Sequence, residues 1–173
     1  MSELFPTDVK LKYVPYTKSN DAVASCGNPI DFDLAKELPG KKIVLTAAPG
    51  AFTPTCTEEH IPNYLKNLEK FKSKGVDRVV VVTANDPFVN AAWGKALGSK
   101  DESNYVIFAS DPNAALSKEL GDNFVADLTK AGLGIRTARY TSIIDDGKVS
   151  FLESEEGLGF SEISSASTVL ERL

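Results

Sequence analysis

The sequence predicts an α/β fold in which helices flank a mixed central sheet. Residues 77–84, "DRVVVVTA", hold four consecutive valines, which is typical of a central strand covered on both faces. The apolar run at 41–49 precedes that strand with a helical segment between them, and a strand–helix–strand unit favours a parallel pair. Runs at 139–145 and 148–153 flank Asp146-Gly147, a strong hairpin signal that adds an antiparallel pair.

The N-terminal part of the chain contains two expected strands separated by a long loop. Residues 10–16, "KLKYVPY", partly alternate between polar and apolar side chains, and Pro15 favours an edge position for this strand. Residues 17–40 are expected to be irregular, with "CGNP" marking a turn. Residues 41–49, "KKIVLTAAP", are expected to form a buried strand that Pro49-Gly50 ends.

Two helices are expected in the next part of the chain. Apolar side chains recur at helical spacing in the first: Ile61, Tyr64, Leu65, Leu68 and Phe71. Pro62 predicts a kink or an interrupted first part in this helix, and Gly75 predicts its end. The second helix starts at Pro87, and its inward set is Phe88, Ala92, Trp93 and Ala96.

The remaining elements complete the expected order. A strand at 105–110 and a short helix at 113–121 precede the hairpin, and Ser164 or Ser165 is expected to cap a last helix. Three helix starts pair a capping side chain with proline: Thr53-Pro54, Asp86-Pro87 and Asp111-Pro112. Because the last two strands form a hairpin, a thioredoxin-like fold fits this order better than a long doubly wound sheet.

The composition narrows the class of protein. The 173 residues suit one domain spanning 1–173, and 42% hydrophobic with 25% charged residues is ordinary for a globular chain. The net charge is −5 and no basic cluster stands out, so nucleic acid is not an expected partner. No apolar stretch is as long as a membrane span, and the N-terminus lacks a signal-peptide core. The final "ERL" is not a clean peroxisomal signal, so we expect the cytoplasm.

Cys26 and Cys56 are the two cysteines, and His60 is the single histidine. Two cysteines are too few for a disulfide-stapled scaffold, and without CxxC or HxxxH spacing we expect no metal site. The stretch "PGAFTPTCTEEH", residues 49–60, places Cys56 just after a predicted helix start. Unpaired backbone N–H groups and the helix dipole favour thiolate over thiol there. The helix terminus is too weak alone, so a cation is required; Arg136 and Arg139 are the candidates, and Arg139 is preferred.

These residues also have plainer interpretations. A lone cysteine such as Cys56 is more often a buried structural residue than a nucleophile. Thr53 is expected to cap the helix whatever else it does, and Trp93 is expected in the core. His60 is either a proton shuttle or a residue that orders the helix or an interface.

The order P-x-x-x-T-x-x-C, formed by Pro49, Thr53 and Cys56 in "PGAFTPTC", resembles the peroxidatic motif of peroxiredoxins. The segments "NDPFVNAAWGKALG", "SDPNAALSKELG" and "RYTSIIDDGKV" continue the resemblance in the right order over nearly the whole chain. They are similar to the peroxiredoxin-5 or alkyl hydroperoxide reductase branch, and within it to the fungal thioredoxin-dependent members. The thioredoxin-like fold agrees with this resemblance.

The resemblance implies a thiol-dependent peroxidase that reduces hydrogen peroxide and alkyl hydroperoxides without a cofactor. Cys56 would be the peroxidatic cysteine and become a sulfenic acid. Thr53 would bond the peroxide or the thiolate, Arg139 would stabilise the thiolate and the leaving oxygen, and Pro49 would shield the site from water. Residues 128–138 do not align closely with the family, which leaves Arg136 as an alternative to Arg139.

The resemblance also implies how the enzyme is recycled. In the members that this chain resembles, a cysteine in the N-terminal loop resolves the sulfenic acid of the partner subunit, which here would be Cys26 acting across a homodimer. Thioredoxin would then reduce the intersubunit disulfide. An idle Cys26, with glutathione as the resolving thiol, is the alternative. Two other functions stay open: a peroxide sensor or redox relay, and a non-catalytic thioredoxin-like binding or chaperone module.

Overall fold

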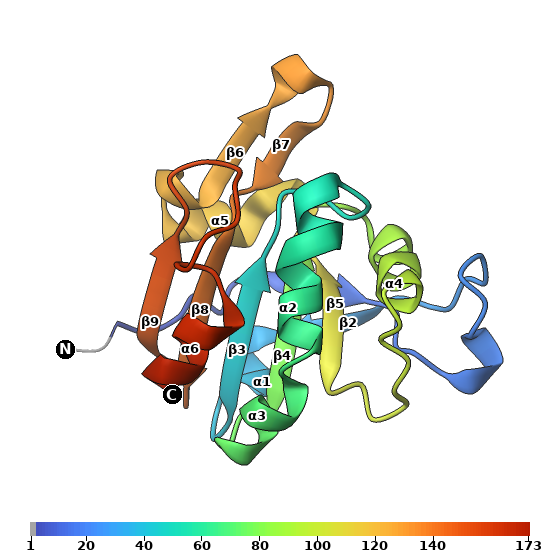
Figure 1. Ribbon diagram of the computed structural model, residues 1–173, viewed down its shortest axis with the longest axis horizontal. Helices are drawn as coiled ribbons and strands as arrows, with labels where there is room; N and C mark the ends of the chain where they lie inside the picture. The colour runs from blue at the N-terminus through green and yellow to red at the C-terminus, as the bar shows by residue number, and fades with distance from the viewer. Residues whose placement is uncertain (1–2) are drawn as a thin grey trace.

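A mixed sheet of seven strands forms the centre of the computed structural model, which describes residues 3–173 (Figure 1). The strand order is β2-β1-β5-β4-β3-β8-β9, and β3–β4 and β4–β5 are parallel pairs while the others are antiparallel. The strands are β1 (Lys10–Tyr13), β2 (Ile30–Asp33), β3 (Lys42–Ala47), β4 (Arg78–Thr83), β5 (Val106–Ser110), β8 (Tyr140–Asp145) and β9 (Lys148–Ser154). The predicted mixed sheet and its parallel β3–β4 pair are confirmed.

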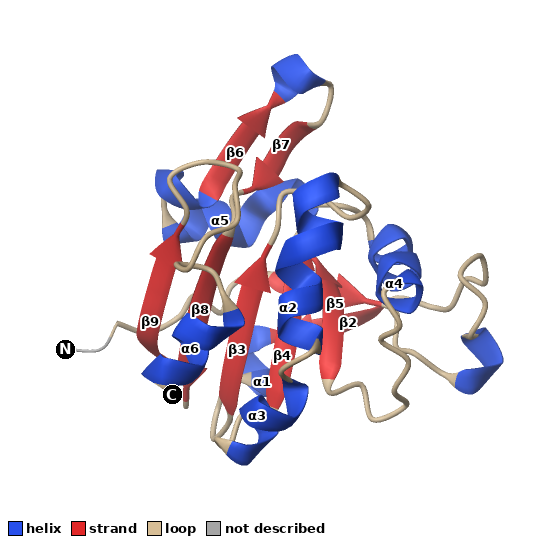
Figure 2. Cartoon of the chain, in the orientation of Figure 1, coloured by secondary structure: helices blue, strands red, loops and turns tan. Residues whose placement is uncertain are grey.

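Helices cover both faces of this sheet (Figure 2). The α-helices are α1 (Leu34–Glu37), α2 (Ile61–Leu65), α3 (Leu68–Ser73), α4 (Pro87–Ala96), α5 (Ala115–Leu120) and α6 (Ala166–Arg172). A π-helical turn, η2 (Cys56–His60), precedes α2, and short 3-10 turns are η1 (Lys18–Asn20), η3 (Pro112–Ala114), η4 (Asp122–Phe124) and η5 (Thr129–Ala131). Figure 2 shows α2, α3, α4 and α6 on one face of the sheet and α1 and α5 on the other.

Alternation along the strands builds a buried cluster on each face of the sheet. Val44 and Val81 pack with Trp93 of α4 in one cluster, to which α2, α3 and α6 also contribute. The neighbouring Leu45 points the other way and packs with Leu116 of α5 and with α1. Because both faces are covered, the central strands are apolar on both sides, as the run of valines predicts.

The structure corrects the predictions for the N-terminal part. β1 lies between β2 and β5 and is not an edge strand, because Pro15 falls beyond the end of the strand and costs it no hydrogen bond. The segment 17–40, expected to be irregular, contains β2 and α1. Each has only four residues, too few for a periodic pattern to show in the sequence.

A second, smaller sheet was not predicted from the sequence. β6 (Val125–Leu128) and β7 (Gly134–Thr137) form an antiparallel pair that projects away from the main sheet (Figure 1). The glycines of this region break the strand pattern, and most of its side chains are exposed. The hairpin at Asp146-Gly147 was predicted and is confirmed, with positive φ at both residues, as a tight two-residue turn requires.

The helix predictions were right in position and partly wrong in detail. Phe88 and Ala96, expected to face inward, are exposed, whereas Trp93 is buried. Gly75 ends α3 with a positive φ, as predicted. The interruption expected at Pro62 takes the form of η2, where the N–H of Ile61 donates to the carbonyl of Cys56; a second break separates α2 from α3.

The predicted helix caps are realised unevenly. Asp86 accepts hydrogen bonds from the N–H groups of Phe88 and Val89, as expected. Asp111 instead accepts from the first turn of α5, beyond the proline that follows it. Ser165 caps α6 by accepting from the N–H of Thr168, which decides between the two serines.

Candidate active site

The register of two antiparallel strands places the predicted site residues together. Ala47, the last residue of β3, pairs with Tyr140, the first residue of β8. The chain leaves β3 toward Cys56 at this edge, and Arg139 immediately precedes Tyr140. The sheet therefore brings two residues far apart in sequence to the carboxyl end of one central strand, where parallel α/β sheets place their sites.

Cys56 begins η2, two residues after the helix starts at Pro54, and only 1% of its surface is exposed. It belongs to the buried cluster that contains Ala48 and Ile61. Glu58 and Glu59, in the same helical turn, are exposed to solvent. The sulfur is therefore buried at a helix start, and local movement is needed before a second thiol can reach it.

Arg139 supplies the nearest cation. Its Nη2 donates to the Sγ of Cys56 at 3.3 Å, and its Nε and Nη2 both donate to the carbonyl of Leu158, at 3.2 and 2.9 Å. Arg136 approaches the same loop but bonds the carbonyl of Pro49 (3.2 Å) and the Oδ1 of Asn85 (3.3 Å) instead. The guanidinium that contacts the sulfur is therefore that of Arg139.

The charge on Arg139 is buried and unpaired by any acid. Its side chain is 1% exposed, and it forms no ion pair with a carboxylate among residues 3–173. A guanidinium stays protonated in proteins, and a buried charge is costly unless it is compensated. Of the groups that Arg139 contacts, only the Cys56 sulfur can become an anion.

His60 holds the guanidinium from the other side. Its Nδ1 lies 2.7 Å from the Nη1 of Arg139, and its Nε2 lies 2.8 Å from the Oγ1 of Thr46. Nη1 can only donate, so Nδ1 must accept and the proton must be on Nε2. Burial lowers the pKa of His60 well below its usual value, and the positive charge of Arg139 lowers that pKa further. His60 is therefore a neutral acceptor.

Three hydroxyl groups extend this hydrogen-bond network beyond His60, and the direction of each bond is fixed. The Tyr64 hydroxyl lies 2.8 Å from the carbonyl of Ser164, which can only accept, so this hydroxyl donates there. It must then accept from Thr141, at 3.0 Å, and Thr141 must accept from Thr46, at 3.0 Å. With one proton per hydroxyl, every hydrogen bond from Arg139 to Ser164 has one possible direction. This buried network fixes the orientation of Arg139.

The loop between β3 and η2 is held by its own set of bonds. The Oδ1 of Asn85 accepts from the N–H of Ala51 at 2.9 Å, and Arg136 bonds Pro49 and Asn85 as described above. Pro49 itself is buried. The motif at residues 49–60 did not indicate Asn85, because this residue follows β4 in the sequence and contacts the loop only in the folded protein.

Thr53 corrects one prediction. Its Oγ1 donates to the carbonyl of Gly50 at 2.6 Å and makes no hydrogen bond to the N–H groups of the helix that follows. Its hydroxyl therefore closes a turn and does not cap the helix. Phe52, between the two, has a positive φ of 57° and is 53% exposed, which leaves an apolar ring on the surface beside the site.

The segment after β9 contributes to the site. Glu155 accepts hydrogen bonds from Ser161 and Ser164 and so fixes the loop that presents the Leu158 carbonyl to Arg139. These bonds hold the pKa of Glu155 below its ordinary value, although partial burial opposes them. Sequence reasoning missed Leu158 because it acts through its backbone.

Cys26 occupies different surroundings. It is an exposed free thiol in the loop between β1 and β2, while Cys56 is free and buried. Cys26 borders a hollow of about 350 Å³ that is also lined by Val23, Phe52 and Phe88. Both cysteine-bearing segments therefore reach the same apolar hollow, since Phe52 precedes Cys56 by four residues.

Across residues 3–173, no three His, Cys, Asp or Glu side chains gather closely enough to hold an ion. In the same residues no helix has the length and apolar character needed to cross a membrane.

Comparison with known proteins agrees with this geometry. The family described as Redoxin matches residues 7–170. The chain is 46% identical to the putative peroxisomal peroxiredoxin of Lipomyces kononenkoae, covering 98% of this chain and 100% of that protein. It is 43% identical to the putative peroxiredoxin prxA of Emericella nidulans, over 98% and 95%. The structure of reduced Prx3 of Vibrio vulnificus in complex with hydrogen peroxide superposes with a TM-score of 0.81 at 34% identity, over 99% and 96%.

Proposed function

The chain belongs to the peroxiredoxin family, and on that premise we propose that Cys56 is the peroxidatic cysteine of a thiol-dependent peroxidase. The observation that carries this proposal is the 3.3 Å contact from Arg139 to the Cys56 sulfur. A buried guanidinium without a carboxylate partner favours the thiolate, because the thiolate supplies the missing negative charge.

The first step is a two-electron oxidation of sulfur by the peroxide. The thiolate of Cys56 attacks one peroxide oxygen, an S–O bond forms and the O–O bond breaks. The other oxygen leaves as an alkoxide or hydroxide, takes up a proton and departs as alcohol or water. Hydrogen peroxide and alkyl hydroperoxides are both substrates in this scheme, and no cofactor takes part.

Three residues assist this step. Arg139 stabilises the thiolate and then the charge that develops on the leaving oxygen. Thr53 donates its proton to Gly50 in the resting site, so its oxygen lone pairs are available to accept the O–H of a peroxide. Pro49 is buried beside the turn and keeps water from the sulfur.

Cys26 resolves the sulfenic acid in the second step. Its thiolate attacks the Cys56 sulfur, an S–S bond forms and the S–O bond breaks. The oxygen leaves as hydroxide and takes up a proton to become water. Because Cys56 is buried, η2 must unwind locally for Cys26 to reach the sulfur. A π-helical turn interrupts the regular α-helix, and such turns are frequent at functional sites.

The disulfide is proposed to join two subunits of a homodimer. Val23, Phe52 and Phe88 surround the hollow beside Cys26, and the last two are 53% and 45% exposed. Exposed apolar side chains around a concave surface favour a partner, and a twofold dimer would face each Cys26 with the partner's Cys56 segment. Thioredoxin then reduces the disulfide by exchange.

The peroxidase is tested by peroxide consumption with thioredoxin, thioredoxin reductase and NADPH, and separately with glutathione. The wild type is expected to turn over many times with thioredoxin, and Cys56→Ser is expected to be inactive. If neither reductant supports turnover and Cys56→Ser matches the wild type, the peroxidase proposal is wrong. Stoichiometric oxidation of Cys56 without recycling would instead indicate a sensor.

The resolving disulfide is tested on a non-reducing gel after treatment with one equivalent of peroxide. The wild type is expected to shift to a dimer, and Cys26→Ser is expected to stay a monomer with a free sulfenic acid. A compact monomer would place the bridge within one chain. An unchanged pattern in Cys26→Ser would assign resolution to an outside thiol.

The cytoplasm remains our proposal for the location of the protein. The relative from Lipomyces kononenkoae is named peroxisomal, which is a statement about that protein. Microscopy of an N-terminally tagged chain distinguishes a diffuse signal from peroxisomal spots.

A further inference from the structure

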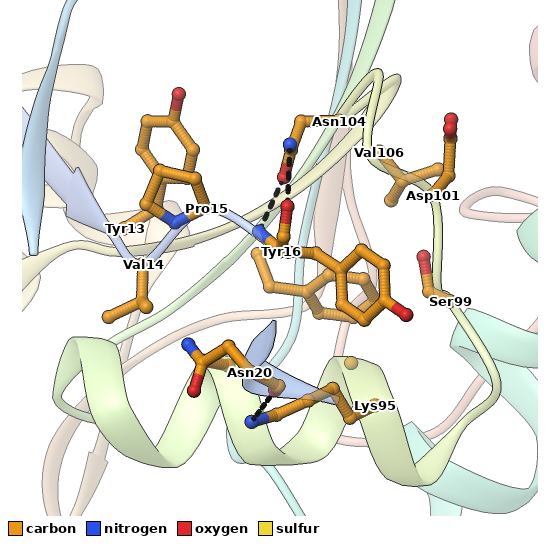
Figure 3. A pocket seen from close by; sticks show the side chains of 13 residues that line it. Tyr13, Val14, Pro15, Tyr16, Asn20, Lys95, Ser99, Asp101, Asn104 and Val106 are labelled. Atoms are coloured by element: carbon orange, nitrogen blue, oxygen red, sulfur yellow. Dashed lines mark hydrogen bonds between the residues drawn. The ribbon is translucent and has the colours of Figure 1, made fainter. Parts of the chain in front are cut away.

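Lys95 is a second buried cation, and it lies outside the site described above. It belongs to α4 and its residue surface is 5% exposed. Its Nζ donates to three backbone carbonyls, those of Asn20 (3.0 Å), Ala22 (2.8 Å) and Ser25 (2.9 Å). Figure 3 shows the lysine reaching from its helix to Asn20. An ammonium group has three N–H donors, so these carbonyls satisfy it completely.

The three carbonyls belong to the segment that ends at Cys26. In this segment the side chains of residues 21–24 are exposed, so it buries little apolar surface of its own. A segment of this kind stays ordered only where polar contacts hold its backbone. Lys95 supplies the buried contacts.

Other contacts on this segment are exposed at the surface. Asp21 pairs with Lys100 at 3.1 Å and accepts from the Tyr16 hydroxyl at 2.8 Å, and both contacts are open to solvent. Exposed ion pairs contribute little to order. On the other side of Cys26, Gly27 is enclosed: a Cβ there would lie 2.6 Å from Val14. Cys26 is thus held between two fixed points, while its own thiol remains exposed.

The helix that carries Lys95 is also tied to the Cys56 segment. Trp93 donates from its indole N–H to the Oγ1 of Thr57 at 3.0 Å, and Thr57 follows Cys56 directly. Gly94 lies against the ring of Phe108, where an added Cβ would come within 2.8 Å, so α4 sits close on the sheet. One fixed helix therefore contacts both cysteine-bearing segments.

We propose that Lys95 is a positioning residue for the resolving step, because its three hydrogen bonds hold the 20–25 backbone so that Cys26 is presented to the oxidised Cys56 of the partner subunit. This inference rests on the proposed function. Burial lowers the pKa of Lys95, while Cys26 and Asp21 nearby oppose that shift. Three carbonyl acceptors around Nζ require its three donors, which is the ammonium form. Lys95 touches neither the peroxide nor the Cys56 sulfur, so it acts on the second step alone.

The test separates the two steps in single-turnover experiments. Reduced protein is mixed with peroxide, quenched with an alkylating agent at set times, and analysed by mass spectrometry for sulfenic acid, disulfide and overoxidised Cys56. Lys95→Met is expected to form the sulfenic acid at the wild-type rate and the disulfide at least about tenfold more slowly, which corresponds to about 1.4 kcal/mol. Overoxidation at a given peroxide concentration is expected to rise in parallel.

Two further variants make the result specific. Lys100→Met removes a positive charge that contacts the same segment from its exposed side, and it is expected to resolve at the wild-type rate. Lys95→Gln keeps an amide donor, so it is expected to slow resolution less than Lys95→Met does. If Lys95→Met does not fold, the resolution rate of Lys95→Gln tests the role of Lys95. Thermal unfolding checks that each variant tested is folded.

The outcomes distinguish this inference from the proposed function. If wild-type Cys56 forms no sulfenic acid, the proposed function fails. If the wild type behaves as a peroxidase and the folded Lys95 variants resolve at the wild-type rate or faster, the role of Lys95 is refuted. Equal slowing of both steps would show a general structural effect and would also refute it.

Discussion

Lowering the pH should destabilise this protein through one residue, His60. The network described above holds its imidazole neutral, with Nδ1 accepting from Arg139 and Nε2 donating to Thr46. Protonating Nδ1 would point an N–H at the N–H of a guanidinium 2.7 Å away and bury a second positive charge. The folded state therefore excludes a proton that the unfolded chain accepts.

The size and sign of the effect follow from proton linkage. The pKa of His60 lies well below its usual value in the folded protein, whereas an unfolded histidine has a pKa of about 6.5. Because the unfolded state binds more protons, stability is greatest above pH 6.5 and is lost as the pH falls. Between pH 7.5 and pH 5.5 the loss is about 1.4 kcal/mol, and the slope approaches about 1.36 kcal/mol per pH unit.

The assay is urea unfolding of the reduced protein at fixed concentration across this pH range. His60 is the only histidine, so His60→Gln removes the one side chain that ordinarily titrates there. Asp111 is the buried acid to consider: burial raises its pKa, which gives an effect of opposite sign that is present in both proteins. The difference in unfolding free energy between wild type and His60→Gln is therefore expected to change with pH by the slope given above.

Two results would contradict this reasoning. Wild-type stability that stays flat from pH 7.5 to 5.5 would mean that the folded protein accepts the proton. Parallel slopes in wild type and His60→Gln would assign the titration to another group. Either outcome would remove the argument that a neutral His60 orients Arg139.

Three further predictions concern the same site. Arg139→Lys is expected to slow Cys56 oxidation by roughly 10²-fold or more, because a compact ammonium lacks the planar fork whose separate nitrogens reach His60 on one side and the sulfur and the Leu158 carbonyl on the other; stopped-flow peroxide kinetics measure it. Thr53→Val is expected to lower stability by about 1 kcal/mol by losing the bond to Gly50, and also to slow oxidation, while Thr53→Ser retains both; a stability loss with unchanged kinetics would restrict Thr53 to the turn. Glu155→Gln is expected to lower the melting temperature at pH 7, and this difference is expected to shrink as the pH falls through the lowered pKa of Glu155 and the wild-type carboxylate takes up a proton; a difference that does not change with pH would contradict this.

The central fold was predictable because its signals are strong and local. Four valines in β4 and the Asp146-Gly147 turn define a buried strand and a hairpin with little dependence on the rest of the chain. Three features were not predicted: β2, α1 and the β6–β7 pair. They are short or exposed, and other segments of the chain decide how they pair. The edge position assigned to β1 failed for the same reason, since β2 was not expected.

Some features of the site could likewise be predicted from the sequence, and others could not. The spacing of Pro49, Thr53 and Cys56 is local, and the contact of Arg139 with the sulfur follows from the register of β3 and β8. The Leu158 carbonyl could not be predicted, because every residue type has the same backbone acceptor. The Thr53 hydroxyl was assigned to the wrong bond, since a turn and a helix cap compete for the same side chain.

The charge at the site links the two chemical steps. By the proposed mechanism Cys56 is a thiolate before oxidation, and its charge compensates the buried Arg139 that contacts η2. Conversion to sulfenic acid removes that negative charge, and neutral His60 cannot replace it. The guanidinium is then buried without compensation, a state that favours solvent exposure of the segment around it. Oxidation of Cys56 by the proposed mechanism thus weakens the packing that must open before Cys26 can reach the sulfur.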